Sequence, residues 1–324
     1  MAAKSNKRAF VTGIAGFAGS WLAERLLAEG YEVHGALAPG EPTGNLAAIT
    51  GKLKLVRLDI RQARKCLTVL ARIKPSSIFH LAAFASVGRS FEQEREVYRV
   101  NVEGTLNILQ ASLGLDLLKR FVFVSSPDCY GLVLPRNRTL TETDPLAPVS
   151  PYGISKAAAE QICLGFFRRH GLPVVVARAF NHTGPRQSPD FAVPSLARQI
   201  AMIETGKQRP VIMVGNLSAK RDLSDVRDIV RGYQLLAERG RPGQVYHLCR
   251  GRAMSIRSVL NRLVSLSDRP IKVGVDAAKL RPVDIPVLRG SFDKASQEVG
   301  FEHRYTFMTT LVDTLNYWRE ILNK

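Results

Sequence analysis

Three glycines near the N-terminus constrain the fold more than any other feature of this 324-residue chain. Gly13, Gly16 and Gly19 follow the apolar run 9–11 and precede a helix-patterned segment, 21–29. Closely spaced glycines between a strand and a helix allow a tight turn, bring backbone amides near a phosphate, and point the helix N-terminus at the anion. The spacing differs by one residue from the Gly-x-Gly-x-x-Gly dinucleotide fingerprint, and a plain glycine-rich turn would look similar. The segment therefore predicts a strand–turn–helix unit that can hold a pyrophosphate.

Strand-like and helix-like patterns alternate through the first half of the chain. Apolar runs that predict buried strands lie at 9–12, 32–37, 54–58, 77–82, 121–125 and 173–178. Helical patterns lie between them, at 16–29, 61–73, 91–113 and 152–170. This repetition predicts an α/β fold with a doubly wound parallel sheet.

The pattern changes after about residue 180. Proline and glycine become frequent, and short strands expected at 211–214 and 245–249 alternate with helices at 255–266 and 306–322. We therefore expect a smaller α/β domain over the carboxyl edge of the sheet, where open α/β sheets bind their ligands.

Tyr152 and Lys156 stand four residues apart in a helical pattern, which places a phenol and an ammonium on one face of the helix. A nearby positive charge favours the phenolate, so we expect the pKa of Tyr152 to fall from its usual value of about 10. Such a tyrosine can act as a general acid or base. Pairs with this spacing are also common on solvated helices, so the pair gains meaning only from its context.

Two hydroxyls, Ser125 and Ser126, end the apolar run 121–125. Because ligands bind beyond the carboxyl ends of parallel strands, Ser126 is a candidate hydrogen-bond donor to a substrate carbonyl. Cys129 follows closely, and we interpret it as a small buried residue rather than a nucleophile.

These three features, in this order and at these separations, are similar to the motifs of the extended short-chain dehydrogenase/reductase family, and the resemblance covers the whole chain. It implies a Rossmann domain of residues 1–180 and about 222–249, because the chain of that family crosses back. A nucleotide-sugar-binding domain would comprise about 181–221 and 250–324. The resemblance also implies a homodimer.

The resemblance implies NAD or NADP as the coenzyme and assigns roles to individual residues. Ser126, Tyr152 and Lys156 would be catalytic, with Asp128 at the position of a further acid–base residue. Coenzyme contacts would come from Tyr152 and Lys156 and from Gly13, Ala15, Gly16, Phe17, Ala18, Asp59, Ile60, Leu81, Ala82, Ala83 and Asn101. The segment 33–39 has neither the acid expected beside a ribose 2′-hydroxyl nor the arginine expected beside a 2′-phosphate, so the choice of coenzyme stays open.

Three segments of the second half, 180–186, 214–228 and 280–284, look like the elements by which nucleotide-sugar members of the family hold a sugar diphosphate. The substrate contacts that the resemblance implies are Ser86, Ser126, Asn181, Val214, Arg221, Arg281 and Asp284. Arginine suits phosphate oxygens because its guanidinium is always charged and donates in a planar fork. Arg221 could equally form a structural ion pair with Asp222 or Asp225.

Within that class the chain is most similar to GDP-4-keto-6-deoxy-D-mannose reductases, which implies hydride delivery to C4 of a GDP-linked keto-sugar and a GDP-D-rhamnose product. GDP-mannose 4,6-dehydratases are the alternative. Their elimination step uses a Glu where this chain has Asp128, one methylene shorter and preceded by Pro127, and Phe17 replaces an Asp that is common among them. Epimerases come third. A non-catalytic RNA-binding or scaffold homologue would be expected to lose the catalytic residues, which are present.

A formal net charge of +18 raises nucleic-acid binding as another class of function. The basic residues are spread out, without a five-residue basic run or interleaved aromatic residues. We therefore expect a surface that attracts an anionic substrate and no specific nucleic-acid binding. Four scattered cysteines suggest neither a zinc site nor disulfides, so we expect no metal and a reducing cytoplasm. No apolar stretch approaches the roughly 18 residues of a membrane span.

Overall fold

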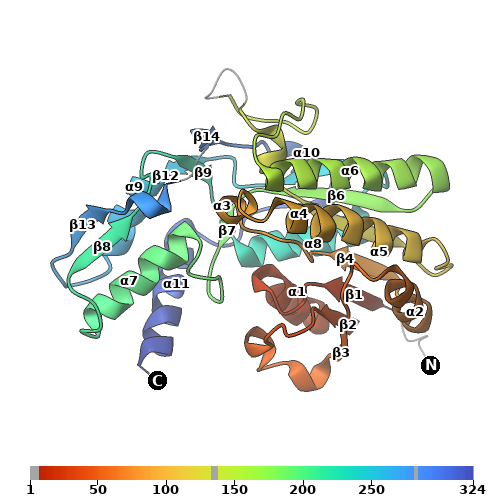
Figure 1. Cartoon of the computed structure of the whole chain (residues 1–324), viewed down its shortest axis with the longest axis horizontal. Helices are drawn as coiled ribbons and strands as arrows, with labels where there is room; N and C mark the ends of the chain where they lie inside the picture. The colour runs from red at the N-terminus through yellow and green to blue at the C-terminus, as the bar shows by residue number, and fades with distance from the viewer. Residues whose placement is uncertain (1–6, 133–137, 281–283, 324) are drawn as a thin grey trace.

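The computed structural model describes residues 7–132, 138–280 and 284–323. Its centre is a seven-stranded sheet with the strand order β11-β6-β5-β4-β1-β2-β3 (Figure 1). The strands are β1 (Arg8–Thr12), β2 (Glu32–Leu37), β3 (Lys54–Arg57), β4 (Ser77–His80), β5 (Arg120–Ser125), β6 (Val174–Ala179) and β11 (Val245–Leu248). Every neighbouring pair is parallel, and the chain moves outward from β1 in both directions. The predicted doubly wound parallel sheet is confirmed.

Helices cover both faces of this sheet, because side chains along each strand alternate between the faces. Ala9 and Val11 of β1 lie in one buried cluster, and Phe10 lies in another. The first cluster includes α1 (Phe17–Ala28), α8 (Val226–Arg239) and α10 (Asp293–Val299), and the second includes α2 (Ala63–Ile73), α5 (Gly104–Ser112) and α6 (Pro151–His170). The sheet is therefore the middle layer of three.

Local sequence signals fix the start and the end of α6, the long helix at the top of Figure 1. The Ser150 side chain accepts a hydrogen bond from the Gly153 nitrogen, and Pro151 occupies the first helical position. The helix ends at Gly171 in the left-handed conformation that a side chain disfavours. These caps place Tyr152 and Lys156 in the first two turns of the helix.

The remaining elements form a smaller part of the molecule, drawn at the left of Figure 1. Its hydrophobic cluster contains residues from α7 (Ala192–Glu204), α9 (Ile256–Val264), α11 (Phe307–Leu322) and β8 (Val211–Val214), and β8 pairs with β13 (Lys272–Val275). Two further small sheets are present. One contains β12 (Ala253–Ser255), β9 (Lys220–Asp222) and β14 (Val287–Leu288), and the other pairs β10 (Ser224–Asp225) with β7 (His182–Thr183). Between β9 and β12 the chain returns to the large sheet as β11. The exact domain boundaries stay a prediction.

Short segments complete the fold. They are α3 (Val87–Ser90), α4 (Glu94–Tyr98), a π-helical turn (Arg99–Glu103), and 3₁₀ turns at Gly44–Leu46, Thr50–Lys52, Pro127–Tyr130 and Ala277–Lys279. Within the described ranges, no helix has both the length and the apolarity needed to cross a membrane.

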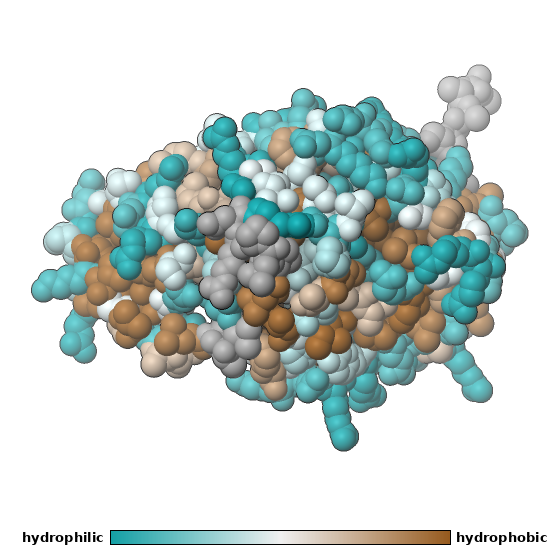
Figure 2. Space-filling model, turned by 90° about the horizontal axis from the view of Figure 1, so that it is seen from above, coloured by the Kyte–Doolittle hydropathy of each residue, from teal (hydrophilic) through white to brown (hydrophobic). Residues whose placement is uncertain are grey.

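Hydrophobic side chains reach the surface of the smaller part. Figure 2 shows them gathered at the end of the molecule where Figure 1 draws β8 and β13. On these two strands Met213, Val273 and Val275 are exposed. Hydrophilic side chains cover most of the rest of the rim in this view.

Candidate active site

A cavity of about 1610 Å³ lies over the carboxyl ends of the sheet strands. Its walls come from the glycine turn, from the residues that follow β4, β5 and β6, and from the smaller part of the molecule. Drug-sized ligands occupy pockets of about 300–1,000 Å³. The cavity is therefore large enough for two ligands side by side, such as a dinucleotide and a nucleotide sugar.

The glycine turn forms one end of the cavity. Gly13 has φ +69°, and a Cβ on Gly19 would lie 2.1 Å from the Gly13 oxygen, so a side chain fits at neither position. Gly16 precedes α1, and no side chain caps this helix. Phe17 lines the cavity with these three glycines. The exposed amides at the start of α1 form a cradle that fits a pyrophosphate.

The flanking predicted residues divide into those that line the cavity and those that lie behind it. Ala18 lines it, as do Asp59, Ile60 and the run Leu81, Ala82 and Ala83. Ala15 is not among the described residues that line it. Its side chain is buried, and its carbonyl accepts a hydrogen bond from Asn45.

The strand predicted at 77–82 ends at His80, and Thr12 explains why. The Thr12 hydroxyl lies 2.8 Å from His80 Nδ1 and accepts a hydrogen bond from the Ala82 nitrogen at 3.1 Å. This contact turns the chain out of the sheet and toward the cavity. Burial lowers the pKa of His80 to about 3, so its ring is neutral in the core.

Asn101 is not among the described residues that line the cavity, and its predicted contact with the coenzyme stays a prediction. Its side chain accepts a hydrogen bond from the Phe84 nitrogen at 2.7 Å and donates to the Ser155 hydroxyl at 2.9 Å. Phe84 follows β4 and Ser155 lies on α6. Asn101 is therefore a positioning residue that joins the loop after β4 to the helix carrying Tyr152 and Lys156.

Asp59 lines the cavity but is already engaged. Both of its carboxylate oxygens accept hydrogen bonds from Arg61, and Arg61 also pairs with Glu96 at 2.6 Å. The Arg61 hydrogen bonds hold the pKa of Asp59 below its ordinary value. Its predicted contact with the coenzyme stays a prediction.

Tyr152 and Lys156 both line the cavity from α6. The Lys156 side chain is buried, with Nζ 4.7 Å from the centre of the Phe123 ring, and burial lowers its pKa to about 8. Burial, followed by the Asp128 carboxylate, raises the pKa of Tyr152, and the Ser126 hydroxyl opposes this shift only in part. The expected lowering of the tyrosine pKa is therefore wrong for the protein without ligands, because the buried site disfavours a phenolate. Tyr152 stays protonated, as a proton donor must be.

Ser126 and Asp128 are linked to each other beside Tyr152. Ser126 Oγ donates to Asp128 Oδ2 at 2.9 Å and accepts from the Asp128 nitrogen at 3.2 Å. Both residues line the cavity. To donate to a substrate oxygen, the Ser126 hydroxyl has to turn away from the Asp128 carboxylate.

A buried ion pair that sequence reasoning missed lies behind this wall. Arg178 Nη2 of β6 lies 2.5 Å from Glu160 Oε1 of α6, and Ser125 Oγ donates to Glu160 Oε2 at 2.7 Å. Arg178 Nη1 also donates to the Tyr130 hydroxyl at 2.5 Å. These contacts hold α6 against β5 and β6. The sequence feature that could have indicated this ion pair is Arg178, the only charged residue in the apolar run 174–179.

The substrate side of the cavity is lined by predicted residues from several elements, namely Ser86, Asn181, Val214, Arg221 and Asp284. Arg221 Nη2 lies 2.5 Å from Asp284 Oδ1, and its Nη1 donates to the Ile285 carbonyl at 2.6 Å. Its ion-pair partner is therefore Asp284 rather than Asp222 or Asp225. Arg281 lies outside the described residues.

Four residues of the cavity wall carry a buried polar side-chain atom with no hydrogen-bond partner among the described residues. The atoms are Asn181 Oδ1, Arg186 Nη1, the Tyr233 hydroxyl and Trp318 Nε1. Buried polar groups are normally hydrogen-bonded, so each is a candidate contact for a bound ligand or water.

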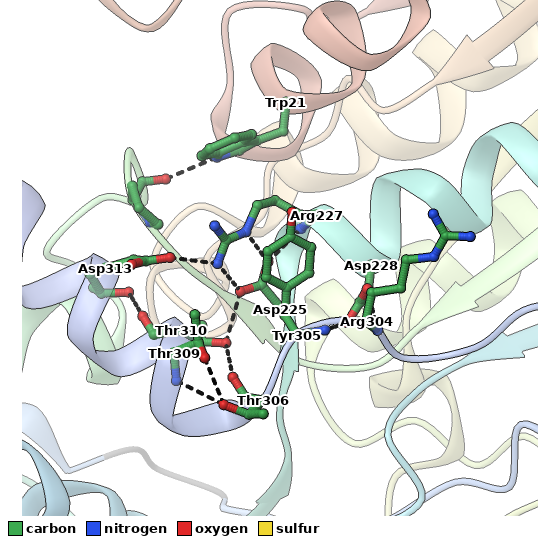
Figure 3. Close-up of polar contacts among 12 residues, drawn as sticks. Trp21, Asp225, Arg227, Asp228, Arg304, Tyr305, Thr306, Thr309, Thr310 and Asp313 are labelled. Carbon is green, nitrogen blue, oxygen red and sulfur yellow. Dashed lines mark hydrogen bonds and ion pairs between the residues drawn. The ribbon is translucent and has the colours of Figure 1, made fainter. Parts of the chain in front are cut away.

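A polar cluster fixes α11 to α8 (Figure 3). Arg227 donates to both carboxylate oxygens of Asp225, pairs with Asp313 at 2.7 Å, and lies 3.7 Å from the centre of the Tyr305 ring. Thr310 of α11 donates to Asp225 at 2.8 Å. The smaller part is thereby anchored to a helix that packs on the large sheet, which fixes the position of the cavity's far wall.

Comparisons with known proteins agree with this geometry. The family model described as GDP-mannose 4,6 dehydratase matches residues 10–314. GDP-6-deoxy-D-mannose reductase of Pseudomonas aeruginosa is 32% identical over 312 residues, covering 96% of this chain and 97% of that protein. GDP-mannose 4,6 dehydratase of Homo sapiens is 30% identical over 337 residues, covering 94% and 89%.

Two solved structures have the same fold. RMD from Pseudomonas aeruginosa, complexed with NADPH, has a TM-score of 0.83 and 31% identity, covering 97% of this chain and 99% of that one. UDP-glucose 4-epimerase of Thermus thermophilus, complexed with NAD, has a TM-score of 0.86 and 28% identity, covering 96% and 99%.

Proposed function

Since the chain belongs to the GDP-mannose 4,6-dehydratase family of NAD(P)-dependent nucleotide-sugar enzymes, we propose that it reduces the C4 ketone of GDP-4-keto-6-deoxy-D-mannose to give GDP-D-rhamnose. One observation carries the proposal: a tyrosine that burial keeps protonated stands beside Ser126 at the wall of a two-ligand cavity. Reduction of a ketone needs a proton donor at the carbonyl oxygen. The similarity to GDP-6-deoxy-D-mannose reductase over nearly the whole chain supports the same reaction.

The residues of the cavity can hold both ligands. The amides of the glycine turn would bind the coenzyme pyrophosphate, and Lys156 would hold the ribose of the nicotinamide. The hydride for C4 comes from the reduced nicotinamide when the coenzyme is bound. Asn181 and Arg221, at the other side of the cavity, would contact the sugar diphosphate.

The protein's own part in the reaction is to orient the carbonyl and to protonate it. The Ser126 hydroxyl turns from Asp128 to donate a hydrogen bond to the C4 oxygen, which holds it beside the Tyr152 phenol. As charge develops on this oxygen, Tyr152 transfers its proton to it. The positive charge of Lys156 stabilises the phenolate that remains.

The 4,6-dehydratase activity of several relatives is the competing function. It requires an extra acid or base that reaches C5 and C6 of the sugar. Asp128 is the candidate, but its carboxylate accepts the Ser126 hydrogen bond at 2.9 Å and its side chain is short. This favours reduction over elimination. Epimerisation comes third.

A two-substrate assay tests the proposal. The preformed 4-keto-6-deoxy sugar should oxidise NADH or NADPH, measured as loss of absorbance of the reduced nicotinamide. GDP-mannose with NAD or NADP should give no 4-keto-6-deoxy product. Turnover of GDP-mannose at a rate comparable to reduction would replace this proposal with the dehydratase.

The proposal includes a homodimer in the cytoplasm without specific nucleic-acid binding. All four cysteines are buried free thiols, which suits a reducing compartment. Light scattering of the purified protein should give twice the mass of one chain.

A further inference from the structure

The loop after β2 places the carboxylate of Glu41 at the wall of the cavity. Ala38, Pro39, Gly40 and Glu41 form a tight turn in which the Glu41 nitrogen donates to the Ala38 oxygen at 3.1 Å. Proline at its second position and a glycine with φ +75° at its third are what a type II turn requires. Glu41 Oε2 also accepts a hydrogen bond from the Ala38 nitrogen at 2.8 Å. The local sequence thus holds this carboxylate in place.

Glu41 lies at the end of the cavity that the glycine turn forms. It lines the cavity with Pro39 and Asn45, and Asn45 Nδ2 donates to the Ala15 carbonyl inside the glycine turn at 3.1 Å. This contact fixes the loop beside the turn. Glu41 follows Gly19 by 22 residues. In dinucleotide folds, an acid about 20 residues after the glycine motif accepts a hydrogen bond from the ribose 2′-hydroxyl.

We propose that Glu41 selects the coenzyme, by accepting a hydrogen bond from the ribose 2′-hydroxyl of NADH and by repelling the 2′-phosphate of NADPH. The inference rests on the proposed function, because it concerns the coenzyme of that reaction. A phosphate monoester carries about two negative charges near neutral pH, and a like charge in contact with it is unfavourable. The chain therefore differs in coenzyme from the Pseudomonas aeruginosa relative whose structure contains NADPH.

Arg57, at the end of β3, approaches the same turn from outside. Its Nη1 donates to the carbonyl oxygens of Ala38 and Glu41, at 3.0 and 2.9 Å. The side chain is exposed, and Arg57 is not among the described residues that line the cavity. Arg57 stabilises the turn, whereas Glu41 lines the cavity.

Direct coenzyme binding tests this inference without any turnover. Dissociation constants for NADH and NADPH are measured by fluorescence titration for the wild type, Glu41→Gln and Glu320→Gln. We expect the wild type to bind NADH about tenfold or more tightly than NADPH, and Glu41→Gln to bring the two constants within about threefold. Glu320 is exposed on α11 and outside the cavity, so Glu320→Gln loses the same charge and should keep the wild-type ratio.

Other binding results would overturn either the inference about Glu41 alone or the proposed function as well. Equal or tighter binding of NADPH by the wild type, or a ratio that Glu41→Gln does not change, overturns the inference and leaves the proposed reductase standing. Arg57→Met should weaken both coenzymes alike, and a selective loss of NADPH binding would assign selection to Arg57 instead. If the folded wild type binds neither coenzyme, the proposed function fails together with the inference.

Discussion

The ammonium nitrogen of Lys156 lies 4.7 Å from the centre of the Phe123 ring, on a side chain that is almost closed to solvent. The face of an aromatic ring attracts a cation, but it replaces only part of the lost water. Burial therefore lowers the pKa of Lys156 to about 8. The same burial raises the pKa of Tyr152. Of the two groups, it is the lysine that titrates close to neutral pH.

Reductase activity should fall as the pH rises through about 8. Below this value Lys156 carries its proton and can stabilise the Tyr152 phenolate, and above it the charge is lost, because burial has lowered the pKa from 10.5 to about 8. Tyr152 keeps its proton across this range. The pH profile of kcat/KM, which reports the free enzyme, should show a decline with an apparent pKa near 8.

Lys156→Arg is the matched control for this titration. A guanidinium stays charged above pH 8, so the variant should lose the alkaline decline even though its larger side chain lowers the maximal rate. A wild-type profile that stays flat through pH 8, or the same decline in Lys156→Arg, would assign the titration to another group.

Tyr152→Phe should lower kcat by about 10²–10⁴, the usual contribution of a general acid. The variant removes only the phenolic oxygen, so its melting temperature and its coenzyme dissociation constant should remain near those of the wild type. Tyr98→Phe removes the same atom from a partly exposed residue of α4, which is not among the described residues that line the cavity, and should leave kcat unchanged. Near-wild-type turnover by Tyr152→Phe would exclude it as the proton donor.

Features written in neighbouring residues could be predicted from the sequence. The glycine turn, the alternation of strands and helices, and the Tyr152–Lys156 spacing are local patterns, and the carboxyl ends of parallel strands meet at one edge. This is why Ser126, Asp128 and Tyr152 were expected together, and they do line one cavity.

Contacts between distant residues could not be predicted in the same way. Arg221 pairs with Asp284, 63 residues away, although nearer aspartates were available as partners. The Asn101 side chain forms hydrogen bonds with the loop after β4 and with α6. The direction of the Tyr152 pKa shift depends on burial, which only the folded chain defines. The sequence did not predict the choice between NADH and NADPH, because Glu41 lies beyond the segment 33–39. Only the turn after β2 places Glu41 at the cavity.

Arg178→Met should lower the free energy of unfolding by about 3–5 kcal/mol, because it leaves the buried Glu160 carboxylate without its partner. The two side chains are 5% and 0% exposed. Urea denaturation measures the change. The double variant Arg178→Met/Glu160→Gln should recover part of the loss, since no unpaired charge remains.

The control for this pair is Arg241→Met, which breaks the exposed ion pair with Glu298. Exposed pairs contribute little, so its urea midpoint should stay near that of the wild type. If Arg178→Met is as stable as Arg241→Met, the buried pair does not hold α6 in place.

The basic surface should make substrate capture depend on salt. With a net charge of +18, kcat/KM for the GDP-sugar should fall as ionic strength rises, while kcat changes little. DNA or RNA should bind only weakly, with a Kd of about 10⁻⁴–10⁻⁶ M at physiological salt. A sequence-selective nanomolar complex with RNA would contradict the view that the basic surface serves to attract the GDP-sugar.

Asp128→Asn separates the two leading reactions. Asparagine keeps the size of the side chain and an oxygen that accepts the Ser126 hydrogen bond, but it cannot exchange a proton as an acid or base. A reductase that uses Tyr152 as its acid should therefore lose less than about tenfold in kcat, whereas loss of an essential acid–base group costs about 10²–10⁴. The measurement is oxidation of NADH or NADPH by the preformed 4-keto-6-deoxy sugar, run beside formation of 4-keto product from GDP-mannose. If the wild type dehydrates GDP-mannose and Asp128→Asn abolishes that activity while reduction survives, Asp128 is an elimination base and the chain is a dehydratase.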